Sequence, residues 1–249
     1  MMSGVAIVTG GGRGIGAATA RLLAQRGWDV CVSWVSNPGA ADEVVRDARA
    51  AGVRALAVRA DVGVEADVLR LFAETDAALG RVGALVNNAG IVAPSRRVDE
   101  YDAARLEAMF RTNVIGAFLC AREAVRRMST RHGGPGGTIV NVSSVASRLG
   151  SPAEYVDYAA SKGAIDTMTV GLAKEVASEG IRVNAVRPGL TYTDIHASGG
   201  EPGRVDRLKD AIPMKRGGEA IEVARAIAWV LSDEASYVTG AVLDVGGGR

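Results

Sequence analysis

A glycine-rich turn between an apolar run and a helical pattern constrains the fold of this chain more than any other feature. Residues 5–8 are apolar, residues 9–16 read Thr-Gly-Gly-Gly-Arg-Gly-Ile-Gly, and a helical pattern follows from about residue 15 to 26. A strand that turns through glycines into a helix directs backbone N–H groups and the helix dipole at one point, which suits a phosphate. A tight turn without a ligand would also use glycine. The flanking strand and helix favour nucleotide binding, although Gly10, Gly14 and Gly16 depart from the GxGxxG spacing.

The rest of the chain repeats the alternation of strand and helix. The expected strands are residues 5–8, 29–34, 53–58, 84–86, 138–142, 181–186 and 241–245. The expected helices are about residues 15–26, 40–51, 69–79, 99–131, 157–178 and 219–231. This order predicts an α/β fold, with a parallel sheet covered by helices on both faces. Because no linker or internal repeat interrupts it, we expect residues 1–249 to form a single domain.

Composition excludes several classes of function. The chain has 249 residues, 48% of them hydrophobic, and a net charge of +1, so nothing suggests a nucleic-acid or membrane partner. No apolar run is long enough for a membrane span or signal peptide. Cys31 and Cys120 lack CxxC partners, so we expect no metal site and no disulfide. These features are typical of a cytoplasmic protein.

Tyr158 and Lys162 are candidates for proton transfer. They stand four apart in a helical pattern and therefore share one face. A phenol has a pKa of about 10, and lowering it by about 3 units takes about 4 kcal/mol of differential interaction. A lysine together with a second cation, such as an oxidised nicotinamide ring, could supply this in a site that excludes water. Alone, such a pair is more often a surface lysine beside a half-buried tyrosine.

Further polar residues stand at the carboxyl ends of expected strands, where parallel sheets bind their ligands. They are Asp61 with Val62, and Asn87 with Gly90, although each is also a common turn residue. After the second strand, residues 33–37 carry no carboxylate to repel a 2′-phosphate, and Arg13 in the glycine turn could pair with one. Both features favour NADP over NAD.

Two segments break the regular pattern. Asn113 stands inside the helical pattern 99–131, where asparagine is mildly unfavourable, so it marks a kink, a capped break or a polar group facing a site. Residues 191–210 are rich in glycine, serine and charge, include His196, and show little periodicity. A connection of this length predicts a lid or specificity loop, at about residues 190–212.

Taken in order, these motifs resemble the classical short-chain dehydrogenases/reductases over essentially the full length. The matching segments are residues 9–16, 61–62, 87–90, 113, 144, 158 with 162, 188–189 and 237–240. Residues 142–152 and 196–204 also resemble a bacterial subgroup of uncharacterised, glucose 1-dehydrogenase-like oxidoreductases. The resemblance implies a Rossmann-type, doubly wound, seven-stranded parallel sheet, and a homotetramer or dimer.

The resemblance also implies roles for individual residues. Tyr158 would be the acid/base, Lys162 would lower its pKa and hold the nicotinamide ribose, and Ser144 would hydrogen-bond the substrate oxygen. Asn113 would hold a water that continues the proton path. The expected cofactor contacts are Gly10, Arg13, Gly14, Ile15, Gly16, Ser36, Asp61, Val62, Asn87, Ala89, Gly90, Tyr158, Lys162, Pro188, Gly189, Thr191 and Thr193.

One ambiguity concerns Ser143 and Ser144. Ser144 matches the family pattern, but the gap to Tyr158 is one residue longer than in many relatives. Because neighbouring side chains on a strand point to opposite faces, we expect one of the two to face Tyr158.

The expected function is an NADP-preferring oxidoreductase of a small-molecule carbonyl or secondary alcohol. The alternatives are a sugar (glucose 1-) dehydrogenase, a 3-oxoacyl-carrier reductase, and a non-catalytic NADP-binding regulator. The complete set of residues 113, 144, 158 and 162 argues against the regulator. Acidic residues among the arginines of the lid argue against a docking site for an acidic carrier protein.

Overall fold

A seven-stranded parallel sheet forms the centre of the protein, and the computed structural model describes residues 4–249. The strand order is β3-β2-β1-β4-β5-β6-β9, and every neighbouring pair is parallel. The strands are β1 (Val5–Val8), β2 (Asp29–Trp34), β3 (Ala55–Arg59), β4 (Val82–Asn87), β5 (Gly137–Val142), β6 (Ile181–Pro188) and β9 (Val242–Val245). The expectation of a doubly wound α/β fold with seven strands is confirmed.

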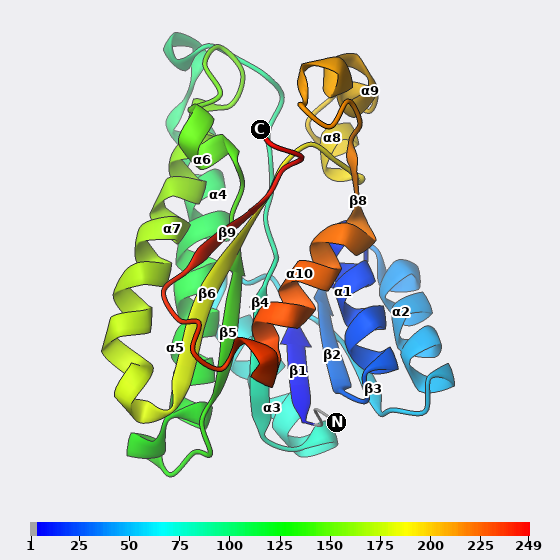
Figure 1. Ribbon diagram of the computed structural model, residues 1–249, viewed down its shortest axis with the longest axis vertical. Coiled ribbons are helices and arrows are strands. Elements are labelled where there is room, and N and C mark those ends of the chain that lie inside the picture. Colours follow the sequence, from blue (N-terminus) through cyan, green and yellow to red (C-terminus); the bar gives the residue numbers. More distant parts are fainter. Residues whose placement is uncertain (1–3) are drawn as a thin grey trace.

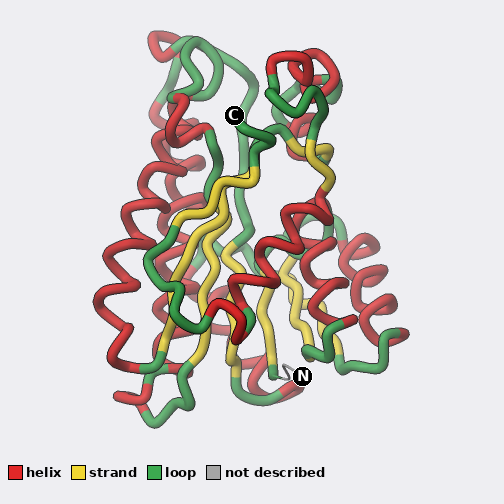
Figure 2. Tube along the Cα trace, viewed as in Figure 1, coloured by secondary structure: helices red, strands yellow, loops and turns green. Residues whose placement is uncertain are grey.

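Helices cover both faces of this sheet (Figures 1 and 2). One face carries α1 (Gly14–Gln25), α2 (Pro38–Ala50) and α10 (Ala220–Leu231). The other carries α3 (Glu65–Leu79), α5 (Gly116–Met128) and α7 (Val156–Val176). The two apolar cores lie between the sheet and these two layers of helices, so the sheet is buried on both sides.

The strand β1 shows how the sequence serves both cores. Val5 and Ile7 belong to the core under α3, α5 and α7, whereas Ala6 and Val8 belong to the core under α1, α2 and α10. Side chains along a strand alternate between faces, so a strand buried on both sides has to be apolar at every position. This explains why the strand residues form continuous apolar runs.

The strand order reverses at β1, which lies between β2 and β4. From β1 the chain winds outward through β2 and β3, and then crosses to β4 on the other side. The connections that leave β1 and β4 therefore diverge to opposite sides and leave a crevice at the carboxyl ends of these strands. The glycine turn lies at this crevice.

The expected helix 99–131 is divided. It consists of a 3₁₀ turn η1 (Val98–Glu100), α4 (Ala103–Phe110), a π-helical turn η2 (Arg111–Ile115), α5, and a 3₁₀ turn η3 (Thr130–His132). The kink expected at Asn113 is therefore a wide turn with one extra residue.

The segment that contains the expected lid holds more regular structure than its sequence indicates. It contains β7 (Thr191–Tyr192), α8 (Ile195–Ser198), α9 (Arg204–Leu208) and a 3₁₀ turn η5 (Lys209–Ala211). β7 pairs with β8 (Gly218–Glu219) in a second small sheet. The short helix α6 (Ala146–Leu149) was also not predicted. The remaining elements are the 3₁₀ turns η4 (Ala177–Glu179) and η6 (Asp233–Ala235).

Other sequence expectations concern membranes, metals and cysteines. Within residues 4–249, none of the helices combines the length and apolar character needed to cross a bilayer. The same residues contain no group of three or more His, Cys, Asp or Glu side chains placed to hold a metal ion. Cys31 and Cys120 are buried free thiols, and burial raises the pKa of each to about 12.

Candidate active site

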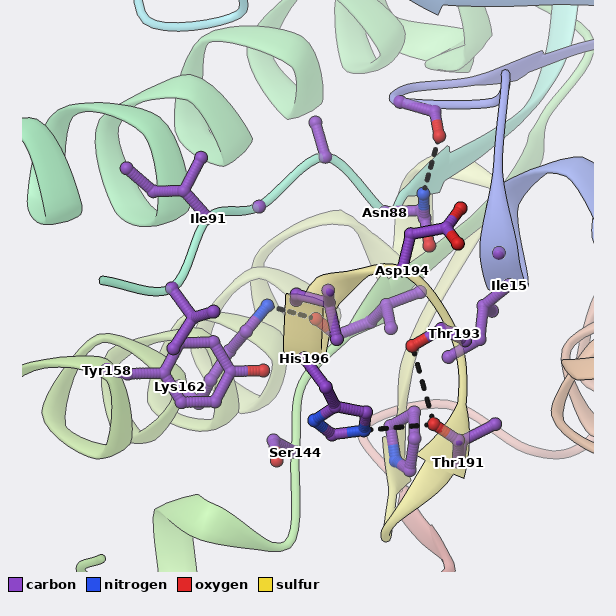
Figure 3. Close-up of a pocket in the computed structure, with 18 of the residues that line it drawn as sticks. Ile15, Asn88, Ile91, Ser144, Tyr158, Lys162, Thr191, Thr193, Asp194 and His196 are labelled. Atoms are coloured by element: carbon purple, nitrogen blue, oxygen red, sulfur yellow. Dashed lines mark hydrogen bonds between the residues drawn. The ribbon is translucent and has the colours of Figure 1, made fainter. Parts of the chain in front are cut away.

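A cavity of about 840 Å³ opens at the carboxyl ends of the strands, at the crevice where the strand order reverses. Figure 3 shows part of its lining. Sixteen of the expected site residues contribute to its wall: Gly10, Arg13, Gly14, Ile15, Ser36, Asp61, Val62, Ala89, Gly90, Ser144, Tyr158, Lys162, Pro188, Gly189, Thr191 and Thr193. The fold therefore brings together residues that are up to 183 positions apart in the sequence, from Gly10 to Thr193. Gly16, Asn87 and Asn113 are not part of this lining.

The glycine turn adopts backbone conformations that other residues rarely reach. Gly10 has φ +62° and Gly14 has φ +53°. A Cβ on Gly10 would lie 3.0 Å from the Cα of Ala89, so a side chain there would press against the opposite wall. Gly16 has another reason to be glycine, because a Cβ there would lie 2.5 Å from the oxygen of Gly10. Gly16 therefore packs closely against Gly10 within the glycine turn, and its contact with a phosphate stays a prediction.

The side chain of Asn87, for which a cofactor contact is expected, lies outside the cavity lining. Its amide donates to the main-chain oxygen of Ala117 (3.1 Å) and to Oδ1 of Asn141 (3.0 Å), so it ties β4 to α5 and β5 inside the core. The next residue, Asn88, lines the cavity, and its amide donates to the oxygens of Thr9 and Gly10 at 2.9 and 3.1 Å. Successive residues at a strand end point in different directions, and the sequence alone does not show which asparagine faces the crevice.

Tyr158 and Lys162 lie on the first two turns of α7, and both line the cavity. Tyr158 is half-buried, and Lys162 is only 4% exposed. The Lys162 ammonium donates to the main-chain oxygen of Val142 at 2.7 Å and lies 5.7 Å from the centre of the Tyr158 ring. Helical spacing thus places both groups at the crevice, as expected from the sequence.

The protein alone does not lower the pKa of Tyr158. Burial raises that pKa, and a hydrogen bond with Ser144 opposes the increase. Burial also lowers the pKa of Lys162 to about 8, against a smaller opposing effect of Asp166. Desolvation disfavours the charged form of each of these two side chains. This agrees with the requirement for a second cation beside Lys162, and the role of Lys162 in lowering the pKa of Tyr158 stays a prediction.

The ambiguity between the two serines has a structural answer. Ser143 is 2% exposed, and its hydroxyl donates to the main-chain oxygen of Lys162 at 3.1 Å. The Ser144 hydroxyl lies with Tyr158, and it also accepts from the main-chain nitrogen of Ala146 at 3.1 Å. Ser143 therefore fastens α7 to the end of β5, whereas Ser144 presents its hydroxyl to the cavity beside the phenol.

Asn113, in the π-helical turn, is hydrogen-bonded to the backbone of Ile91, a residue of the cavity wall. Its Oδ1 accepts from the nitrogen of Ile91 (2.8 Å), and its Nδ2 donates to the oxygen of Ile91 (3.0 Å) and to Ser161 (3.1 Å). A Cβ on Gly90 would lie 3.4 Å from Asn113 Oδ1 and 3.5 Å from Lys162 Nζ. Because its side chain is already bonded on both atoms, Asn113 positions residues 90–91 around the lysine and does not itself face the cavity.

Arg13 and the end of β2 form one extremity of the cavity. Arg13 is exposed at the start of α1, and Trp34, Ser36 and Asn37 line the wall beside it. The nitrogen of Gly11 donates to the oxygen of Ser33 at 3.0 Å, so the glycine turn and the strand end are joined directly. Arg13 and Ser36 thus both line the cavity.

Comparisons with known proteins agree with this geometry. A family model described as enoyl-(acyl carrier protein) reductase, of the short-chain alcohol dehydrogenase type, matches residues 10–249. The chain belongs to the short-chain dehydrogenase/reductase family. It is 59% identical over 245 residues to the uncharacterized oxidoreductase YgfF of Escherichia coli, covering 98% of this chain and 99% of that protein. It is 43% identical to a cis-4-hydroxycyclohexanecarboxylate dehydrogenase of Sinomonas cyclohexanicum, covering 98% and 95%.

Solved structures of the same family superimpose closely. A short-chain dehydrogenase of Burkholderia cenocepacia in complex with NADP has a TM-score of 0.89 and 33% identity, over 98% of this chain and 96% of that chain. A 3-ketoacyl-(acyl-carrier-protein) reductase of Brucella melitensis complexed with NADH has a TM-score of 0.90 and 32% identity, over 98% and 97%. As a short-chain dehydrogenase/reductase, the protein is an oxidoreductase of alcohol or carbonyl groups that uses a nicotinamide cofactor.

Sequence reasoning missed a cluster of charged and aromatic residues in this dehydrogenase's cavity. Arg204 on α9 is 8% exposed, forms ion pairs with Glu154 and Glu201, and lies 4.9 Å from the centre of the Tyr155 ring. His196 on α8 also lines the cavity. The arginine and the glutamates were visible in the sequence, but Glu154 and Arg204 are fifty positions apart, and no local pattern links them.

Proposed function

We propose that this protein is an NADP-preferring oxidoreductase that interconverts a small-molecule secondary alcohol and its ketone, with Tyr158 as the proton carrier. The observation that supports this proposal most is the convergence of Tyr158, Ser144 and Lys162 on the cavity that the glycine turn also lines. Relatives with alcohol and carbonyl substrates agree with it. The named substrate of one relative is a cyclic secondary alcohol, a class that the apolar part of this cavity could accept.

The residues of the cavity fit a dinucleotide. Gly10 and Gly14 leave space for a pyrophosphate beside the N-terminus of α1, and Gly90 leaves space for a ribose beside Lys162. A cavity of about 840 Å³ lies within the range of cofactor sites. Asp61 and Val62 would contact the adenine, and Ala89, Pro188, Gly189, Thr191 and Thr193 would contact the nicotinamide half. When bound, the nicotinamide supplies or accepts the hydride at its C4.

The side chains of the protein handle the proton. Tyr158 would donate a proton to the substrate oxygen during reduction and remove it during oxidation. Ser144, on the same side, would donate a hydrogen bond to that oxygen and stabilise the charge that develops there. Lys162 would hold a ribose hydroxyl and add positive charge next to the phenol. Asn113 would fix residues 90–91 and thereby the position of Lys162.

A preference for NADP follows from Arg13 and the end of β2. Residues 33–37 lack the carboxylate that would bind the 2′-hydroxyl of NAD and repel a phosphate. Arg13 is the cation that would pair with the 2′-phosphate, and Ser36 would donate to it. The two solved relatives contain NADP in one case and NADH in the other, so the preference rests on these residues of the chain itself.

The decisive experiment is a turnover screen. A panel of secondary alcohols and ketones would be assayed with NADPH, NADH and their oxidised forms, with Tyr158→Phe as the matched variant. We expect turnover by the wild type, faster with the phosphorylated cofactor, and a loss of at least about a hundredfold in the variant with cofactor binding retained. Equal binding of NADPH and no turnover by either protein would favour a non-catalytic regulator instead.

The structure gives less support to a 3-oxoacyl-carrier reductase. Arg204 and Arg207 in the lid segment are paired with Glu201 and Glu154, so their charges are balanced locally. Lys209 is paired with Asp206. An acidic carrier protein would need unpaired basic side chains around the opening of the cavity. A sugar dehydrogenase remains the second candidate, because the cavity holds polar groups beyond Tyr158 and Ser144.

We also propose a homotetramer, or a dimer, located in the cytoplasm. Large apolar side chains are exposed on the π-helical turn, where Ile115 is 51% accessible, on α5, where Phe118 is 52% accessible, and on α10, where Trp229 is 39% accessible. Apolar faces of this kind commonly mark interfaces between subunits. Light scattering on the purified protein would measure the mass of the assembly directly.

A further inference from the structure

His196 is a part of the cavity that the reaction described above does not use. It lies on α8 and lines the cavity together with Tyr158 and Ser144. In the view of Figure 3 its ring lies between the Tyr158 hydroxyl and Thr191. One ring nitrogen, Nε2, is 3.0 Å from the main-chain oxygen of Thr191. This contact also determines which ring nitrogen carries the proton.

The hydrogen bond to Thr191 fixes the tautomer of the ring. A carbonyl oxygen can only accept a hydrogen bond, so Nε2 carries the proton. In a neutral ring the other nitrogen, Nδ1, is then an acceptor. Within residues 4–249, no hydrogen bond is made to Nδ1. The cavity therefore presents an oriented acceptor that has no protein partner.

The surroundings keep this ring neutral. Burial lowers the pKa of His196 below its usual value near 6.5, and the charge of Arg204 acts in the same direction. The bond to Thr191 and the charge of Glu201 oppose this decrease without cancelling it. The neutral ring, in which Nδ1 keeps its lone pair, therefore predominates at pH 7.

The cavity also has apolar lining residues. They are Ile91, Val92, Val145, Leu149, Leu190 and Ile195, besides the polar residues named above. The nearby charged pair, Glu154 and Arg204, is satisfied internally. An acceptor with no partner in such surroundings costs free energy when a ligand displaces its water, unless the ligand carries a matching donor.

We propose that His196 is a specificity-determining residue whose Nδ1 accepts a hydrogen bond from a second hydroxyl of the substrate, so that the substrates are diols, polyols or hydroxyketones. This inference rests on the proposed function, because it assigns the first oxygen to Tyr158 and Ser144. A 3-oxoacyl thioester is disfavoured by the same argument, since its second oxygen is a carbonyl and would face Nδ1 with no proton between them.

Two variants separate the role of Nδ1 from that of Nε2. In His196→Gln, the amide nitrogen can still donate to Thr191, but no acceptor occupies the position of Nδ1. In His196→Asn, the shorter amide can place an oxygen near the position of Nδ1, but it cannot reach Thr191. A purely structural role for His196 predicts that Gln is the better replacement, whereas substrate recognition predicts that Asn is.

The test compares alcohols that differ by one group. Cyclohexanol, the cis and trans isomers of cyclohexane-1,2-diol, and cis-4-hydroxycyclohexanecarboxylate would be assayed for kcat/KM with NADP⁺. We expect the kcat/KM of one diol isomer to exceed those of cyclohexanol and of cis-4-hydroxycyclohexanecarboxylate in the wild type. In His196→Gln the ratio of that diol to cyclohexanol should fall about tenfold, with kcat/KM for cyclohexanol nearly unchanged, and His196→Asn should retain part of the preference. A ratio that His196→Gln leaves unchanged, or a preference for the carboxylate, would overturn the inference.

Binding measurements distinguish failure of this inference from failure of the proposed function. The same compounds would be titrated calorimetrically into protein saturated with NADP⁺. Tighter binding of a diol that is lost in His196→Gln supports the inference even if no compound is oxidised, in which case the proposed function fails alone. Turnover that depends on Tyr158, with equal binding of diol and cyclohexanol, would overturn the inference and leave the proposed function intact. Binding of none of the compounds also counts against the inference.

Discussion

The ammonium of Lys162 donates a hydrogen bond to the main-chain oxygen of Val142, with a distance of 2.7 Å between the two atoms, although the lysine is almost fully buried. This single bond does not compensate for the removal of the charge from water, because burial still lowers the pKa of Lys162 to about 8. The candidate site therefore contains a cation that the fold holds at a cost in stability. Such a cost is common where a group serves function.

Stability should increase when this charge is removed. The folded pKa of Lys162 is depressed below its unfolded value of 10.5, so from about pH 8 upward the unfolded chain binds more protons and stability rises with pH. At pH 7, Lys162→Met should be more stable than the wild type by about 2 kcal/mol, and the difference should shrink at pH 9.5. Urea unfolding at pH 7 and pH 9.5 measures the two stability differences. Lys174→Met, at an exposed position on α7, is the control. A Lys162→Met variant less stable than the wild type at pH 7 would contradict this.

Lys162→Met should be less active at neutral pH, although it should be more stable. Burial raises the pKa of Tyr158, so the phenol depends on neighbouring positive charge to lose its proton at neutral pH. Without Lys162, the pH at which alcohol oxidation becomes fast should move upward by about one unit or more, and cofactor binding should weaken. A pH–rate profile identical to that of the wild type would remove Lys162 from the mechanism.

The two adjacent serines should differ in their effects. Ser144→Ala should lower kcat by about a hundredfold, because its hydroxyl lies beside Tyr158, with little change in stability. Ser143→Ala should leave kcat within a few fold and lower the free energy of unfolding by about 1 kcal/mol, because it removes the bond to the oxygen of Lys162. Steady-state kinetics and urea unfolding on both variants test this, and the reverse assignment would show that Ser143 faces the substrate.

Cofactor preference should depend on Arg13. Arg13→Ala should weaken NADPH binding by about tenfold and change NADH binding little, since the guanidinium would contact only the 2′-phosphate. Arg26→Ala, at the other end of α1 and also exposed, serves as the control for a general change of charge. Fluorescence titration with both cofactors measures the two affinities. Equal losses for NADPH and NADH would refute this role of Arg13.

The lid segment should loosen when Arg204 is replaced. Arg204 joins α9 to Glu154, just before α7, and its side chain is 10% exposed, whereas that of Arg207 is 53% exposed. Arg204→Met leaves Glu154 without its buried partner, so residues 195–212 should exchange their amide hydrogens faster and KM should rise several-fold. Arg207 also contacts Glu201, but Arg207→Met should change hydrogen exchange and KM much less. Unchanged hydrogen exchange in Arg204→Met would show that other contacts hold the lid segment.

Periodicity predicted the long elements well, because each buries a face for its whole length. It could not predict α6 or the β7–β8 pair, since elements of two to four residues are too short to show a period. It also could not show that the side chain of Asn87 is bonded inside the core whereas Asn88 lines the cavity, because the two residues are chemically identical and differ only in direction. The cluster around Arg204 depends on contacts between residues distant in the sequence, which no local rule predicts.

The π-helical turn at Asn113 has a consequence for how much the sequence around it can change in length. A wide turn contains one more residue than the stretch of α-helix that it replaces, so deleting one residue from 111–115 would restore regular winding and remove the bulge that brings Asn113 to Ile91, while α4 and α5 would keep nearly the same mutual orientation. Asn113 would then lose its hydrogen bonds to Ile91, and residues 90–91 would no longer be held beside Lys162. Substitutions at the exposed positions of this turn, Arg111 and Ile115, should therefore be better tolerated than a one-residue deletion, which should abolish activity while most of the sheet still assembles.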